Sequence, residues 1–118
     1  MIRLKQLLSE AAPTNALKIS ATETGKLDIY EQTSNKHYIY KLEAQKALIW
    51  ISISITKIDQ KNHTITYKHP ATGAEINAHV HDKDWYTILA NFEHEQDIEN
   101  METKDGTNIR LVFVKVIN

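Results

Sequence analysis

Near its middle the chain reads Ile49-Trp50-Ile51-Ser52-Ile53-Ser54-Ile55-Thr56, and this stretch decides the fold. Because side chains alternate between the two faces of a strand, the four isoleucines share one face. Their β-branched side chains also favour a strand. We therefore predict a strand with one buried face. The alternation slips at Ile58, which indicates a bulge or bend near Thr56.

The same period of two continues on both sides of this strand. Polar or Pro- and Gly-containing turn sequences, such as His69-Pro70-Ala71-Thr72-Gly73, separate the short apolar runs. Short strands joined by tight turns favour antiparallel pairing. The sequence therefore predicts antiparallel strands over residues 16–80 and another strand over residues 107–117.

Two segments show helical spacing instead. Residues 1–12 place Ile2, Leu4, Leu7 and Leu8 near one face, and Pro13 ends the pattern. A second helix is predicted over residues 82–95, where Asp82 can cap the N-terminus. Its apolar stripe consists of Trp85, Ile88, Leu89 and Phe92.

These elements predict one α+β, mostly β domain over residues 1–118. It combines an N-terminal helix, a strongly curved antiparallel sheet or small barrel, and a second helix before the last strand. The acidic stretch from Asp97 to Gly106 is interpreted as a loop.

Composition narrows the possible chemistry. The 118 residues include no cysteine, which excludes disulfides, thiol catalysis and thiolate metal sites. No apolar run approaches the roughly 20 residues that span a bilayer. The start of the sequence is too short and too charged for a signal peptide, so we expect a cytoplasmic protein.

Charge is distributed unevenly along the chain. Residues 1–68 carry ten Lys or Arg and six Asp or Glu, whereas residues 69–118 carry four and nine. This asymmetry could give the fold two faces of opposite sign or a head-to-tail self-contact. Alternatively, the charges are ordinary solvated surface.

The most metal-like pattern is His79-Val80-His81-Asp82. His79 and His81 point the same way on a strand, and two imidazoles with a carboxylate can hold zinc or iron. The alternative is a solvent-facing histidine pair beside a helix cap. No phosphate loop, nucleophile elbow or acid–base pair is recognisable, so we expect no cofactor and a protein that is not an enzyme.

A basic and aromatic set of side chains suggests nucleic-acid binding. Small β-barrels bind RNA or single-stranded DNA by stacking bases on exposed aromatic rings along a cationic groove. The alternative is that tyrosine and tryptophan simply pack, because they are strand formers. The candidate residues are Lys36, Tyr38, Tyr40, Trp50 and Lys57.

The last strand carries more apolar surface than one buried face requires. Val112, Val114 and Val116 lie on the face opposite Leu111 and Phe113. This second face needs cover, either from the two helices or from another subunit. The three valines are therefore the predicted interface of a homo-oligomer.

The opening Met1-Ile2-Arg3-Leu4-Lys5-Gln6-Leu7-Leu8-Ser9-Glu10-Ala11 resembles the start of small uncharacterised proteins of T4-like, especially marine, phages. Leu8-Ser9-Glu10 followed by Ala11 is also similar to the cleavage site of the prohead protease of those phages. The resemblance implies a phage protein in the host cytoplasm, or a virion structural or internal head protein cleaved after Glu10.

A helix followed by strongly bent strands resembles the Sm-like barrel, a ring-forming RNA-binding relative of SH3-like barrels. The helix over residues 82–95 and the seventh strand depart from that family. The leading hypothesis is a self-associating phage-type β-barrel module with possible RNA or DNA binding. The alternatives are a virion protein and a metal-dependent enzyme at His79 and His81.

Overall fold

The computed structural model describes residues 17–118 except residue 91. The predicted N-terminal helix over residues 1–12 and the predicted cleavage after Glu10 lie outside the described residues. The elements in chain order are β1 (Leu17–Ala21), β2 (Leu27–Glu31), β3 (Lys36–Lys46), β4 (Ile49–Asp59), β5 (Thr64–Lys68), β6 (Glu75–His79), α2 (Asp82–Ala90), β7 (Ile98–Glu102) and β8 (Asn108–Ile117).

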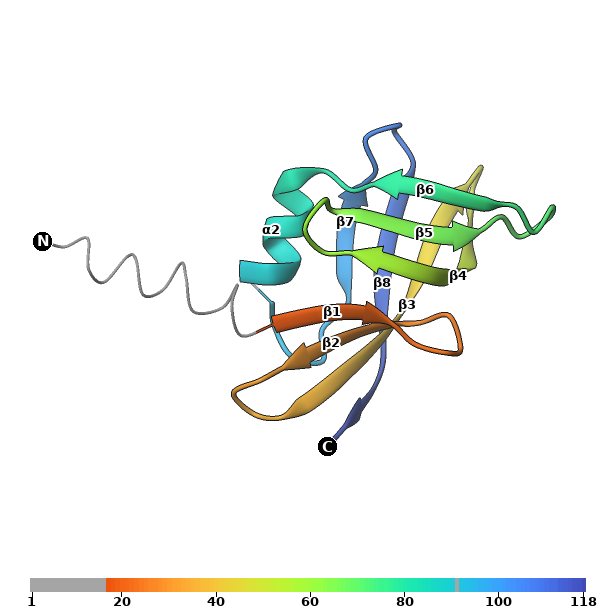
Figure 1. Ribbon diagram of the computed structural model, residues 1–118. Helices are drawn as coiled ribbons and strands as arrows, with labels where there is room; N and C mark the ends of the chain where they lie inside the picture. Colours follow the sequence, from red (N-terminus) through yellow and green to blue (C-terminus); the bar gives the residue numbers. More distant parts are fainter. Residues whose placement is uncertain (1–16, 91) are drawn as a thin grey trace, which may run out of the picture.

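The strands form an antiparallel sheet that closes on itself. Strands β1 to β6 pair in sequence order, while β8 pairs with the long strand β3 and β7 pairs with β8. An antiparallel bridge between Val80 and Thr103 then joins the end of β6 to the end of β7. We call the ring of β3, β4, β5, β6, β7 and β8 the barrel (Figure 1).

The bend in β4 makes this closure possible. Its first half pairs with β3, and its second half pairs with β5. The register shifts between Ile55 and Lys57, which confirms the bulge predicted near Thr56. Because a bulge bends a strand and increases its twist, β4 turns from one wall of the barrel to the next.

The β1–β2 hairpin packs against the second half of β4. The Gln60 side chain accepts a hydrogen bond from the Ile19 N–H at 3.0 Å and donates one to the Leu17 carbonyl at 3.2 Å. Gly25 has a φ of 82° and its carbonyl accepts the Ile55 N–H at 2.9 Å. These contacts occupy backbone groups that an exposed edge would leave open.

The core lies inside the barrel and below the β1–β2 hairpin. Ile53 and Ile55 are buried as their alternation predicts, whereas Ile49 is 61% exposed because it lies at the tip of the β3–β4 hairpin. The largest fully buried side chains are Trp85, Tyr40, Leu27, Ile29, Ile55, Ile65, Ile88, Leu111 and Val80.

Helix α2 closes one end of the barrel (Figure 1). Trp85, Ile88 and Leu89 are buried, so these three residues of the predicted stripe face the core, whereas Phe92 lies beyond the end of the helix and is partly buried. The helix ends at Ala90 and not at the predicted residue 95. Continuing it would place Glu93 and Glu95 at a helix C-terminus, where negative charge is unfavourable.

The acidic stretch predicted as a loop contains strand β7. The sequence gives no strand signal here, because only Ile98 and Met101 are apolar, and they are three residues apart. The structure gives the reason: the register shifts between these two residues, and Asn100 takes a positive φ of 62°. A bulge thus removes the period of two that identifies a strand.

Candidate functional site

Two of the predicted base-stacking residues are buried. Tyr38 is 3% exposed and Tyr40 is 0% exposed. Both pack against Phe92, and the His94 ring stacks on Tyr38 with centroids 4.7 Å apart. The prediction that these tyrosines bind nucleic acid is therefore wrong, and the alternative that they pack as strand residues is correct.

The other three residues of that set do not form one surface. Lys36 begins β3, while Trp50 lies opposite Gln45 near the far end of β3. At about 3.3 Å per residue, nine strand residues separate the two positions by roughly 30 Å. Lys57 lies seven residues beyond Trp50, past the bulge in β4.

A charged cluster covers the Trp50 ring. The Arg110 guanidinium lies 4.2 Å from the ring centroid, and its Nε donates to Glu43 Oε1 at 2.7 Å. Lys41 Nζ lies 3.3 Å from Glu43 Oε2. Long side chains of β3 and β8 therefore supply the cover that the second sheet face needs at this position, without a helix or a subunit.

The Glu43 carboxylate is held in its charged form. Burial is the largest single influence and would raise its pKa. Hydrogen bonds from Arg110 and Lys41, together with their positive charges, outweigh burial and lower the pKa of Glu43 below its ordinary value. The cluster is thus a satisfied structural ion pair in the barrel wall.

The two candidate metal ligands do not assemble a site. The His79 side chain is exposed, and His81 Nε2 lies 3.6 Å from Glu102 Oε1. Within residues 17–118, residue 91 aside, no three His, Cys, Asp or Glu side chains are placed to hold a metal ion. Among the described residues no third side chain of these types therefore joins His79 and His81, and metal binding at this position stays a prediction.

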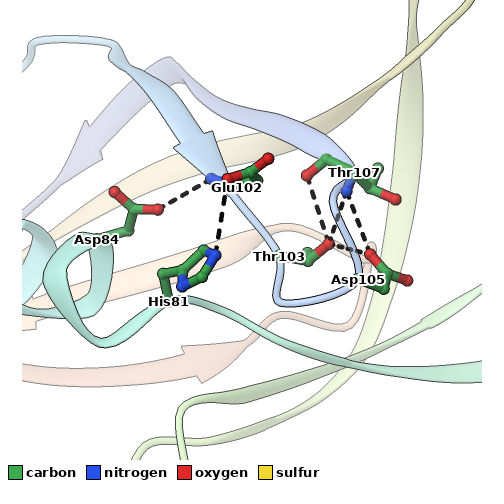
Figure 2. A network of polar contacts seen from close by, with 6 residues as sticks. All are labelled: His81, Asp84, Glu102, Thr103, Asp105 and Thr107. Carbon is green, nitrogen blue, oxygen red and sulfur yellow. Dashed lines mark hydrogen bonds and ion pairs between the residues drawn. The ribbon is translucent and has the colours of Figure 1, made fainter.

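Figure 2 shows the polar contacts around His81, which link α2, β7 and the β7–β8 turn where the barrel closes. The buried Asp84 carboxylate accepts the Glu102 N–H at 2.9 Å, and so ties α2 to β7. In the β7–β8 turn the Thr103 hydroxyl donates to Asp105, and the Thr107 N–H donates to both side chains. The hydrogen bond from Thr103 is the main reason that the pKa of Asp105 lies below its ordinary value.

The end of β8 has a strand partner on one side only among the described residues. Strand β7 pairs with β8 only as far as Leu111, whereas β3 follows β8 to Ile117. On the β7 side, the Phe113 N–H donates to Asp97 Oδ1 at 2.8 Å. No further strand pairs there among the described residues. The last part of β8, which leads to the C-terminus, therefore has one edge without a strand partner (Figure 1).

The predicted interface valines lie along this end of β8. Val114 is 41% exposed, Val112 is half-buried, and Val116 is half-buried against the core. Ile117, which the sequence analysis did not select, is 44% exposed. A β-bulge explains the omission: Phe113 pairs with Tyr40 and Lys115 with Ile39, which leaves Val114 unpaired and shifts the following residues to the other face.

A second exposed apolar group lies at the tip of the β3–β4 hairpin. Leu48 is 93% exposed and follows Ala47, whose φ is 56°. No sequence period identifies such residues, because a tight turn belongs to neither strand.

Comparisons with protein-family models, with curated protein sequences and with solved structures gave no significant match. None of the helices in the described part of the chain is long and apolar enough to cross a membrane.

Proposed function

We propose that this chain is an assembly module that self-associates by pairing the free edge of β8 with β8 of a second copy. The observation that carries this proposal is that β8 continues for six residues, Val112–Ile117, beyond its last pair with β7, where the Asp97 side chain bonds the Phe113 N–H and no strand covers the rest among the described residues. Unpaired strand edges readily add another strand through main-chain hydrogen bonds.

Apolar side chains accompany the free backbone groups. Val114 and Ile117 are the two large hydrophobic residues of β8 that remain exposed. Antiparallel pairing of two β8 edges would bring these residues of both copies together in a two-fold contact, in which each copy uses the same surface. Burial of their apolar area would then favour association.

Features of β8 also limit how many strands can add. Lys115 is exposed, and the bulge at Val114 twists the edge. Both are devices that restrict open-ended stacking of strands. We therefore propose a closed dimer and not a fibre.

Light scattering coupled to size exclusion tests the proposal. The wild-type chain is expected to elute with twice its monomer mass of 13.6 kDa. A double variant, Val114→Lys with Ile117→Lys, is expected to elute as a monomer, because four like charges would meet across the contact.

Leu48→Lys is the matched control, since it places the same charge on the other exposed apolar group and is expected to leave the dimer intact. A wild-type chain that is monomeric at its highest soluble concentration would contradict the proposal. So would a double variant that keeps the dimer mass.

We also propose a place for this chain in the virion, on the basis of the resemblance of its opening residues to small proteins of T4-like phages. Mass spectrometry of purified virions checks it. A mature chain that starts at Ala11 is the expected result, whereas virions without the chain would contradict it.

A further inference from the structure

An open groove lies at the end of the barrel opposite α2. The β3–β4 hairpin forms one side of it, the β5–β6 hairpin forms the other, and Thr107 of the β7–β8 turn closes it. Its volume is about 450 Å³, within the range of roughly 300–1,000 Å³ that holds small molecules in proteins. The apolar walls consist of Ala44, Ile51, Ile53, Tyr67, Pro70 and Ala71.

The β5–β6 side of the groove has a fixed shape. The His69 N–H donates to the Ala74 carbonyl at 2.8 Å, and the Gly73 N–H donates to the His69 carbonyl at 2.9 Å. In addition, His69 Nδ1 accepts the Ala71 N–H at 3.1 Å. A preformed wall costs less conformational entropy on binding than a mobile one.

This hydrogen bond also sets the chemistry of the His69 ring. Since Nδ1 accepts a hydrogen bond from the Ala71 N–H, the ring proton of the neutral imidazole must lie on Nε2. Since His69 lines the groove, its Nε2–H is the candidate donor there. Tyr67 adds a hydroxyl that stays protonated, because burial and then the nearby Asp105 charge raise its pKa.

Positive charge alone lines the groove among the described residues, and the Asp105 carboxylate lies near Tyr67 without lining it. Lys46 lines it and has no ion-pair partner among the described residues, and no acidic side chain lines it. In a chain whose formal net charge is −1, the groove thus offers one positive charge beside an apolar surface. Such a surface is complementary to an anion with an apolar body.

We propose that this groove binds a small apolar molecule that carries one anionic head group. The apolar body lies between Ile51 and Pro70, and the head group is bound by Lys46 and the Nε2 proton of His69. The site is independent of the proposed self-association, because β8 ends near the start of β3 whereas the groove lies at the end of β3.

Fluorescence titration with two dyes tests the proposal. Anilinonaphthalene sulfonate carries an apolar ring system and one negative charge, and N-phenylnaphthylamine is its uncharged counterpart. The wild-type chain is expected to bind one molecule of the sulfonate per chain, and more tightly than the uncharged dye.

Two variants separate the two parts of the site. Lys46→Glu is expected to lower the affinity for the sulfonate about fivefold, which is the size of effect that one exposed ion pair produces. The affinity for the uncharged dye is expected to stay unchanged. Ile51→Ala is expected to weaken both dyes. The matched controls are Lys57→Glu and Ile49→Ala, which make the same changes outside the groove and are expected to alter neither affinity.

Three results would overturn the proposal. One is equal affinity for the two dyes, and another is an equal effect of Lys46→Glu and Lys57→Glu. The third is an affinity for the sulfonate that falls as protein concentration rises and is restored in the Leu48→Asp variant. That result would show that a second copy of the chain occupies the groove. The Val114→Lys, Ile117→Lys variant, which is expected to be a monomer, is expected to bind both dyes as the wild type does. A failure of self-association therefore remains distinguishable from a failure of dye binding.

Discussion

The two ends of the barrel are built from the same strands and differ in what covers them. At one end α2 inserts Trp85, which is 1% exposed, and Ile88, which is 0% exposed. At the other end Leu48 is 93% exposed beside a groove of about 450 Å³. The connections explain the difference: the β6–β7 connection carries a helix, whereas tight hairpins at the other end have too few residues to cover it.

This difference implies that the α2 end contributes stability and that the open end is available for binding. Trp85 illustrates the first part, since the His63 ring stacks on it at 5.5 Å and its indole Nε1 has no hydrogen-bond partner among the described residues. Its contribution is therefore apolar packing and not hydrogen bonding.

The largest expected effect comes from truncation at the closed end. Trp85→Ala is expected to lower the free energy of unfolding by about 3–5 kcal/mol, because it leaves a large cavity in the core. Chemical denaturation measures this loss. Leu48→Ala is the control at the open end and is expected to stay within about 0.5 kcal/mol of the wild type. Similar losses in the two variants would contradict the comparison.

Two glycines sharpen the comparison, because they have nearly the same backbone conformation in different surroundings. Gly25 has a φ of 82° beside β4, and Gly73 has a φ of 76° at the open end. A Cβ at Gly25 would collide with the Ser54 hydroxyl and lie 3.2 Å from Ser54 Cα, whereas a Cβ at Gly73 would meet nothing within 4 Å.

Gly73→Ala is therefore expected to cost about 1 kcal/mol from the left-handed backbone alone. Gly25→Ala adds a steric clash and is expected to cost at least about 2 kcal/mol. Thermal unfolding of both variants measures the difference between them. Equal costs would show that the contact between the β1–β2 hairpin and β4 is looser than the structure indicates.

The smallest expected effect concerns acid stability of the barrel wall between the two ends. The pKa of Glu43 is lowered in the folded protein, so its charged form favours folding above the pKa of the unfolded chain. That contribution is lost as the pH falls below the ordinary value of 4.5 and through the folded value. Glu43→Gln is expected to show a shallower loss of stability over this range in denaturation curves, and an unchanged slope would contradict the assignment.

The sequence analysis was accurate where a period persisted over many residues. The alternation of Ile53 and Ile55, the bulge before Lys57 and the buried stripe of α2 were all predicted and are all present. It failed where a bulge interrupted the period, as in β7 and at Val114 of β8. It also failed for exposure: Tyr38 and Tyr40 fit a stacking surface by composition, and both are buried.

By itself, the sequence determined that this protein is mostly antiparallel β-structure with a helix after the first six strands, because alternation and helical spacing are local properties. Tertiary structure alone decided which end of the barrel is closed, which edge of β8 is free and where a groove forms. These features depend on strands that are distant in the chain, such as β3 with β8 and Val80 with Thr103, and no local pattern specifies their pairing.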